Sequence, residues 1–261
     1  MQNNIISGLF VGQNLVTLKE VASTNNYLKD LLSNSKPVAE GTVIMAESQY
    51  AGRGQQQNRW HSEAGMNLTF SLLLKPGFLP LQQQFDLTRA ISLGVVNGLQ
   101  NATGLPIQVK WPNDIYYGDK KLGGILVENM VQGSTIKNSV IGIGLNVNQH
   151  IFPNWVPNPT SVKQILQKDY DLHVLLSQIC SCIEAWYLKL KANKLDEIRE
   201  QYLANLYWLN QQHDFASDGI PFTGKIIAVR NNGFLVLSTK NGEKEFTLKQ
   251  IEFLNKPNNI L

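Results

Sequence analysis

The chain has 261 residues, of which 43% are hydrophobic, enough to bury a sizeable core, so disorder is not the default expectation. Its net charge of +3 is too small and too dispersed to indicate a nucleic-acid or membrane partner. No basic segment precedes the first apolar residues and no run approaches the ~20 apolar residues of a membrane span, so we expect a soluble, cytoplasmic protein. The cysteines and histidines fit neither a disulfide framework nor a zinc site.

Hydrophobic periodicity predicts alternating helices and strands in the first hundred residues. Apolar residues at helical spacing follow Ser23 and Thr24, and either side chain is a suitable N-cap. The glycines between 49 and 66 lie among polar residues, and a loop of this length in a compact domain is usually functional. In chain order we expect a helix over 22–34, a strand over 42–48, a loop over 49–66, a strand over 67–75 and a helix over 81–102.

The rest of the chain predicts first a sheet, then helices, then a separate β segment. Short β-branched runs with short links favour a largely antiparallel or mixed sheet over a doubly wound one. Three prolines within 149–160 make that segment a candidate lid. After residue 212 a period-two pattern broken at Asn-Gly turns predicts a small all-β domain, so we expect domains over 1–208 and 212–261. The expected strands cover 108–111, 115–121 with a Gly-Asp turn, 124–131 and 139–148, and the expected helices cover 172–192 and 195–206.

The loop segment QYAGRGQQQNRW, residues 49–60, holds an arginine between two glycines. Backbone N–H groups around Gly52 and Gly54 allow an anion to approach closely, and the Arg53 guanidinium supplies a planar pair of donors. The segment is not a dinucleotide fingerprint, because position 57 is glutamine. A flexible surface loop with one exposed arginine explains the same residues, so this motif alone leaves both interpretations open.

A second polar cluster lies in VKWPNDIYYGDKKLGGILVE, residues 109–128. Asn113 and Asp114 stand at a strand end, which suits either a turn or a Mg²⁺ ion held beside phosphates. Lys121 precedes a pair of glycines, so its ammonium group and open backbone amides converge on one spot. A lysine-rich hairpin with a glycine bulge is the ordinary alternative.

Two shorter motifs carry weaker signals. Alternating glycines in GIGLNVN, residues 142–148, let a backbone or a planar ring approach the strand, where Asn146 or Asn148 can read a base edge. Strand-end glycines with a capping asparagine explain this motif nearly as well. The side chains of STN, residues 23–25, either cap a helix or bind a polar ligand.

The order of these motifs resembles that of the biotin protein ligases. STN, QxxGRG, KWPND, KLGGILVE and GIGLNVN follow one another between about residues 20 and 150, and the C-terminal β pattern extends the resemblance. It implies an α+β fold of the class II synthetase-like type, with a mixed sheet, packed helices and a small Src-homology-3-like barrel. It also implies ATP- and Mg²⁺-dependent activation of biotin to biotinyl-5′-adenylate, followed by transfer to a lysine of a biotin carboxyl carrier protein or biotin carboxylase subunit.

The resemblance also assigns roles to residues of this chain. Lys121 and Arg53 would be catalytic, with Lys121 bridging the biotin carboxylate and the α-phosphate, and Asp114 would hold Mg²⁺. The set implied for biotin is Ser23, Thr24, Asn25, Gln49, Gly52, Arg53, Gly54, Gln55, Lys121 and Gly124. The set implied for ATP or the adenylate is Arg53, Gln55, Trp60, Lys110, Asn113, Asp114, Lys121 and Asn146, with residues 149–160 closing over the adenine.

Two features depart from the family pattern. Where the family often continues GRGRxGR, this chain has GRGQQQNR, so Gln55 replaces an arginine and Gln57 a glycine. Gln55 must then retain the adenylate through neutral hydrogen bonds, or Arg59 must compensate. Only about twenty residues precede STN, fewer than a helix-turn-helix domain needs, so we expect a single-function ligase without DNA binding.

Other functions and assemblies fit parts of the pattern. A lipoate or octanoate ligase or transferase shares the fold, but its usual RRxSGGG loop is absent. A catalytically inactive biotin-sensing module has no need of both Lys121 and Arg53, although Gln55 keeps this alternative open. An exposed sheet edge is compatible with a homodimer, which one sequence does not decide.

Overall fold

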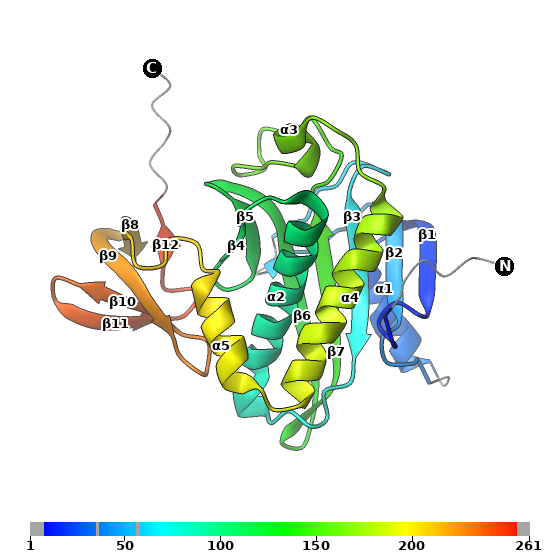
Figure 1. Ribbon diagram of the computed structural model, residues 1–261, viewed down its shortest axis with the longest axis horizontal. Coiled ribbons are helices and arrows are strands. Elements are labelled where there is room, and N and C mark those ends of the chain that lie inside the picture. The colour runs from blue at the N-terminus through cyan, green and yellow to red at the C-terminus, as the bar shows by residue number, and fades with distance from the viewer. Residues whose placement is uncertain (1–7, 35–36, 56–57, 255–261) are drawn as a thin grey trace.

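The computed structural model describes residues 8–34, 37–55 and 58–254 (Figure 1). Within these residues a seven-stranded sheet has the order β1-β2-β3-β7-β6-β5-β4, and its pairs are antiparallel except for β1 with β2. This arrangement confirms the expected α+β fold with a mixed, largely antiparallel sheet. The strands are β1 (Leu15–Val21), β2 (Val43–Gln49), β3 (Leu68–Leu74), β4 (Ile107–Lys110), β5 (Asp114–Tyr117), β6 (Lys120–Gln132) and β7 (Thr135–Leu145).

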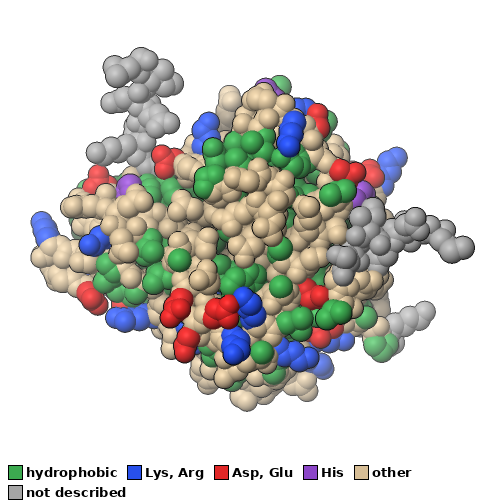
Figure 2. All heavy atoms as spheres, viewed as in Figure 1, with side chains coloured by type: hydrophobic (Ala, Val, Ile, Leu, Met, Phe, Trp, Pro, Cys, Tyr) green, Lys and Arg blue, Asp and Glu red, His purple; other side chains and the backbone are tan. Residues whose placement is uncertain are grey.

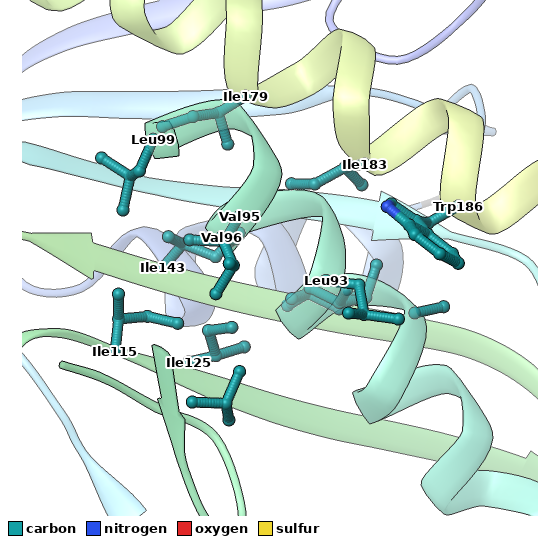
Figure 3. Close-up of a cluster of buried hydrophobic side chains, with 14 of the residues drawn as sticks. Leu93, Val95, Val96, Leu99, Ile115, Ile125, Ile143, Ile179, Ile183 and Trp186 are labelled. Carbon is teal, nitrogen blue, oxygen red and sulfur yellow. The ribbon is translucent and has the colours of Figure 1, made fainter. Parts of the chain in front are cut away.

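Helices cover both faces of this sheet. The long helices α2 and α4 lie side by side across one face, and in Figure 3 Ile179 and Ile183 of α4 lie over α2, which in turn lies over Ile125 and Ile143 of the sheet. Helix α1 packs on the opposite face, where Leu28 contacts a small apolar cluster. The helices are α1 (Thr24–Ser33), α2 (Gln84–Thr103), α3 (Val162–Leu166), α4 (Leu172–Lys191) and α5 (Leu195–Ala204), with a 3₁₀ turn over Leu81–Gln83.

Two glycines explain why α2 and α4 approach so closely. A Cβ atom on Gly94 would lie 2.6 Å from the Cα of Ile183, and one on Gly98 would lie 2.7 Å from the Cα of Ile179. The helices therefore meet backbone to backbone, which rigidly supports the sheet that carries the cavity described below.

A second, five-stranded sheet follows α5, with the order β11-β10-β9-β8-β12. It starts at Gln212, where the sequence places the second domain, although the division into two domains stays a prediction. Trp111 holds this sheet against the first one, because its indole Nε1 donates to the carbonyl of Gly233 at 2.9 Å. The strands are β8 (Gln212–Ser217), β9 (Ile220–Val229), β10 (Leu235–Thr239), β11 (Gly242–Phe246) and β12 (Glu252–Phe253).

The sequence missed two elements and divided the strands differently in one place. Strand β1 has no fully buried residue and no strict alternation, so it gives no period-two signal. Helix α3 spans only Val162–Leu166, too short for a helical period to show. The Gly-Asp turn lies where expected, but it separates β5 from β6, and β6 then continues through 124–131 as one strand.

The surface agrees with the weak net charge. On the face shown in Figure 2, acidic and basic side chains are scattered, with hydrophobic and other side chains between them. Among the described residues, no helix is long and apolar enough to cross a bilayer.

Candidate functional site

A cavity of about 610 Å³ opens on the α1 face of the large sheet, and residues of the C-terminal part, including Ile251 and Phe253, close one side of it. It gathers most of the residues that the sequence singled out, from segments far apart in the chain. Gly52 and Asn146 are not among its lining residues. Those that line it are Ser23, Thr24, Asn25, Gln49, Arg53, Gly54, Gln55, Trp60, Lys110, Asn113, Asp114, Lys121 and Gly124.

At one end of the cavity lies a network of uncharged polar groups. Gln49 Oε1 accepts from the backbone N–H of Thr24 at 2.7 Å and from its hydroxyl at 3.1 Å. The hydroxyl of Ser71, which is fully buried on β3, lies 2.7 Å from the Thr24 hydroxyl and 2.5 Å from Asn25 Oδ1. These groups offer hydrogen-bond donors and acceptors within a small space.

The expectation that Ser23 or Thr24 caps α1 with its side chain is wrong. Ser23 occupies the N-cap position, but its side chain makes no capping bond. Gln49 instead satisfies the free N–H of Thr24, so this helix end depends on the neighbouring strand β2. The side chains of the STN motif are thereby left to line the cavity.

The alternating glycines of β7 form the floor. A Cβ atom on Gly142 would lie 3.0 Å from the Asn25 carboxamide carbon and closer still to Oδ1, and one on Gly144 would lie 2.7 Å from Trp60 Nε1 and overlap the indole ring. The strand therefore admits one planar amide and one planar ring at positions where any larger residue would displace them.

Gly144→Ala should displace the Trp60 indole and weaken ligand binding by about tenfold or more, because overpacking costs about 1–3 kcal/mol and the displaced ring fills the cavity. Calorimetric titration of the purified variant with biotin, the ligand that the motif resemblance implies, measures the change. Gly77→Ala is the matched control, since nothing lies within 4 Å of a Cβ atom there. Equal affinities for Gly144→Ala and the wild type would contradict the role given to this floor.

Arg53 is held at the cavity wall by Glu128. Arg53 Nη2 lies 2.8 Å from Glu128 Oε2, which also accepts from Asn25 Nδ2 at 2.8 Å, and Lys29 Nζ lies 2.9 Å from Oε1. Burial by itself would raise the pKa of Glu128, but the hydrogen bonds from Lys29 and Asn25 and the charges of Arg53 and Lys29 outweigh it, so this pKa lies below its ordinary value. Sequence reasoning missed Glu128, which ties the amide network to the arginine loop.

A second cation stands at the other end of the cavity. Lys121 Nζ pairs with Asp114 Oδ1 at 2.7 Å, and a Cβ atom on Gly124 would lie 3.2 Å from that carboxylate oxygen. The Lys121 backbone is bound to the candidate lid, because its N–H donates to the Asn158 carbonyl and its carbonyl accepts from Thr160 N–H. The lid segment is thus attached directly to the strand that carries the lysine.

Lys110 adds a third cation between the two sheets. Its ammonium lies 4.9 Å from the centre of the Tyr116 ring and 4.8 Å from that of Phe253. Burial lowers the pKa of Lys110, while the Asp114 charge opposes that shift. A positive group with aromatic neighbours suits a nucleotide phosphate or base edge.

Three predicted site residues have mainly internal contacts. Asn113 Nδ2 donates to the Ile125 carbonyl, and the residue is 3% exposed. Asn146 Nδ2 donates to the Thr160 carbonyl, so it anchors the lid segment from beneath the surface. A Cβ atom on Gly52 would lie 2.5 Å from the Trp60 carbonyl oxygen, which makes this glycine necessary for the loop to close. Gln57 lies outside the described residues.

The donor set for a metal ion is sparse. Among the described residues, no group of three His, Cys, Asp or Glu side chains lies close enough to hold a metal. Mg²⁺ commonly uses one or two carboxylates together with substrate phosphates, so Asp114 fits as a ligand only when a nucleotide supplies the other oxygens.

Comparison with known proteins gives a consistent result. A model described as the biotin/lipoate A/B protein ligase family matches residues 18–146. The chain is 32% identical over 247 residues to the bifunctional ligase/repressor BirA of Bacillus subtilis, covering 93% of this chain and 74% of that protein. It is 24% identical over 239 residues to the biotin–[acetyl-CoA-carboxylase] ligase of Paracoccus denitrificans, covering 89% of this chain and 99% of that one. The solved biotin protein ligase of Aquifex aeolicus in complex with biotin and ATP is 30% identical, with a TM-score of 0.78 over 94% of this chain and 100% of that chain.

Proposed function

Because this chain belongs to the biotin/lipoate A/B protein ligase family, we propose that it activates biotin with ATP and transfers it to a lysine of a carrier protein. The biotin carboxylate attacks the α-phosphorus of ATP, forming biotinyl-5′-adenylate and releasing pyrophosphate. A carrier lysine amine then attacks the acyl carbon, forming an amide and releasing AMP. The observation that carries this function is one cavity lined both by an uncharged amide and hydroxyl network and by the cations Arg53, Lys110 and Lys121.

The uncharged network suits the urea group of biotin. A urea has two N–H donors and one carbonyl acceptor, and burying it is favourable only when all three are satisfied. Thr24, Asn25 and Gln49, with Ser23 beside them, provide hydroxyl and amide groups that serve in both roles. A charged lining here would instead cost the desolvation of an unmatched charge.

The cations suit the reacting end. The biotin carboxylate and the phosphates are all anionic, so positioned cations reduce their mutual repulsion and stabilise the charge that develops at phosphorus. Lys121, already oriented by Asp114, takes this position beside the backbone of Gly124. Mg²⁺, when bound beside Asp114, neutralises phosphate charge.

We further propose a biotin carboxyl carrier protein or biotin carboxylase subunit as the protein substrate, and the cytoplasm as the site of reaction. Support for the carrier comes from the relative in Paracoccus denitrificans, whose name specifies acetyl-CoA carboxylase.

Pyrophosphate exchange into ATP tests this function directly. Exchange that requires biotin and Mg²⁺ is the expected result, with lipoate and octanoate inactive under the same conditions. Exchange with lipoate or octanoate in place of biotin would contradict the substrate assignment. Tight biotin binding without any exchange would contradict the ligase activity itself.

Gln55→Arg should slow release of the adenylate. Gln55 lines the cavity near Arg53, and a charge-assisted hydrogen bond to phosphate is roughly twice as strong as the neutral bond that a glutamine makes. Stopped-flow release of preformed adenylate from both proteins measures the effect, with Gln55→Lys separating added charge from the planar geometry of arginine. Unchanged release in both variants would show that position 55 does not contact the adenylate.

A further inference from the structure

Two buried hydrogen-bonding groups in the cavity have no partner among the described residues. They are the hydroxyl of Thr69 on β3 and the indole Nε1 of Trp60 in the arginine loop, and both residues line the cavity. Thr69 is 5% exposed as a whole residue. Since buried polar groups in folded proteins are almost always hydrogen-bonded, this pair suits an acceptor from a ligand, because the described residues supply none.

The side chains of Thr69 and Trp60 both lie beside Gly144 of β7. Thr69 pairs with Gly144 across β3 and β7, and a Cβ atom on Gly144 would lie 2.7 Å from Trp60 Nε1. Ser71 and Gly142, at the urea end, lie two residues away on the same strands and the same face, which is roughly 7 Å. On its other side Gly144 pairs with Gly124, next to Lys121 and Asp114. The unpaired groups therefore lie between the uncharged network and Lys121.

We infer that Thr69 and Trp60 form a further subsite that donates to the thioether sulfur of biotin, an inference that rests on the proposed function. Biotin carries three kinds of acceptor, namely the urea oxygen, the carboxylate and the sulfur. The uncharged network suits the first and the cations suit the second. The sulfur is the one acceptor left, and it lies on the fused ring system between the other two. A neutral, weak acceptor also suits two neutral donors.

This subsite contributes to substrate choice. An octanoyl chain has no acceptor in its middle, so its binding would bury both donors without a partner. Sites built to hydrogen-bond a substrate group reject analogues that lack it for this reason. Thr69 and Trp60 are then specificity-determining residues for the biotin ring.

A cycle of one variant and one ligand analogue tests the inference. Thr69→Val keeps the shape of the side chain and removes the hydroxyl, and desthiobiotin keeps the urea and the carboxylate and lacks the sulfur. Calorimetric titration should show that Thr69→Val weakens biotin binding by about threefold to tenfold, while desthiobiotin binding changes less than about twofold. An equal loss for both ligands, or no loss for either, would overturn the inference.

Two further measurements separate this role from a structural one. Without ligand, Thr69→Val should not lower the melting temperature, because the hydroxyl it removes has no partner among the described residues; a clear decrease would indicate a structural role and overturn the inference. Thr69→Ser should restore the preference for biotin over desthiobiotin, and Trp60→Phe should reduce it. Wild-type protein that bound neither ligand would refute the proposed function, which is a different outcome from equal effects on both ligands.

Discussion

Replacing Lys121 with alanine should slow biotinyl-adenylate formation by roughly 10²-fold to 10³-fold, the loss observed when one preorganised donor to a developing charge is removed. The ammonium is fixed by Asp114 at 2.7 Å and by the hydrogen bonds of its own backbone to the lid segment. It therefore needs little reorganisation when the carboxylate approaches the α-phosphorus. Single-turnover adenylate formation at saturating biotin and ATP measures the chemical step.

The neighbouring Lys120 provides the matched control for this experiment. It is exposed and precedes Lys121 on the same strand, but it is not among the residues that line the main cavity. Lys120→Ala should leave adenylate formation within about twofold of the wild type, as expected for a surface charge. If the rate of adenylate formation by Lys121→Ala were also within threefold of the wild-type rate, Arg53 and Lys110 would be sufficient to stabilise the reacting charge. The role proposed for Lys121 would then be refuted.

Local motifs single out the segments of the candidate site, because the motifs are rich in glycines and in charged or polar side chains. The glycines that flank Arg53 and the lysine before the glycine pair are visible without any knowledge of distant contacts. The structure brings these segments to one cavity. The mostly apolar residues of β3 likewise predicted a strand.

What the sequence did not predict depends on pairing between distant strands. Ser71 and Thr69 lie inside an apolar strand, and their importance follows from their register with Gly142 and Gly144 of β7. Glu128 is the last residue of the KLGGILVE motif. Its position in the site depends on the side chains of Asn25 and Lys29 from α1 and of Arg53 from the arginine loop, which bind its carboxylate. A single sequence contains no signal for such contacts, because register is fixed by the folded sheet as a whole.

Asp86→Asn should lower the free energy of unfolding by about 3–5 kcal/mol, because it would leave a buried arginine without its counter-charge. Asp86 is fully buried and bonds Arg89 through Oδ1, and Arg199 Nη2 lies 2.8 Å from Oδ2. Burial lowers the pKa of Arg89, and the Asp86 carboxylate opposes that shift by stabilising the charged form. Urea unfolding followed by circular dichroism measures the loss.

The same substitution at an exposed pair isolates the effect of burial. Asp169→Asn removes the partner of Lys163 at the surface and should lower the free energy of unfolding by less than about 1 kcal/mol.

Arg89 also donates to the carbonyls of Val229 and Arg230, just before the turn whose Gly233 carbonyl accepts from Trp111. Asp86→Asn should therefore loosen the C-terminal sheet first, so that Phe253 leaves the cavity and ATP affinity falls before the large sheet unfolds. Equal costs for both Asp→Asn substitutions would contradict the stabilising role given to this buried cluster.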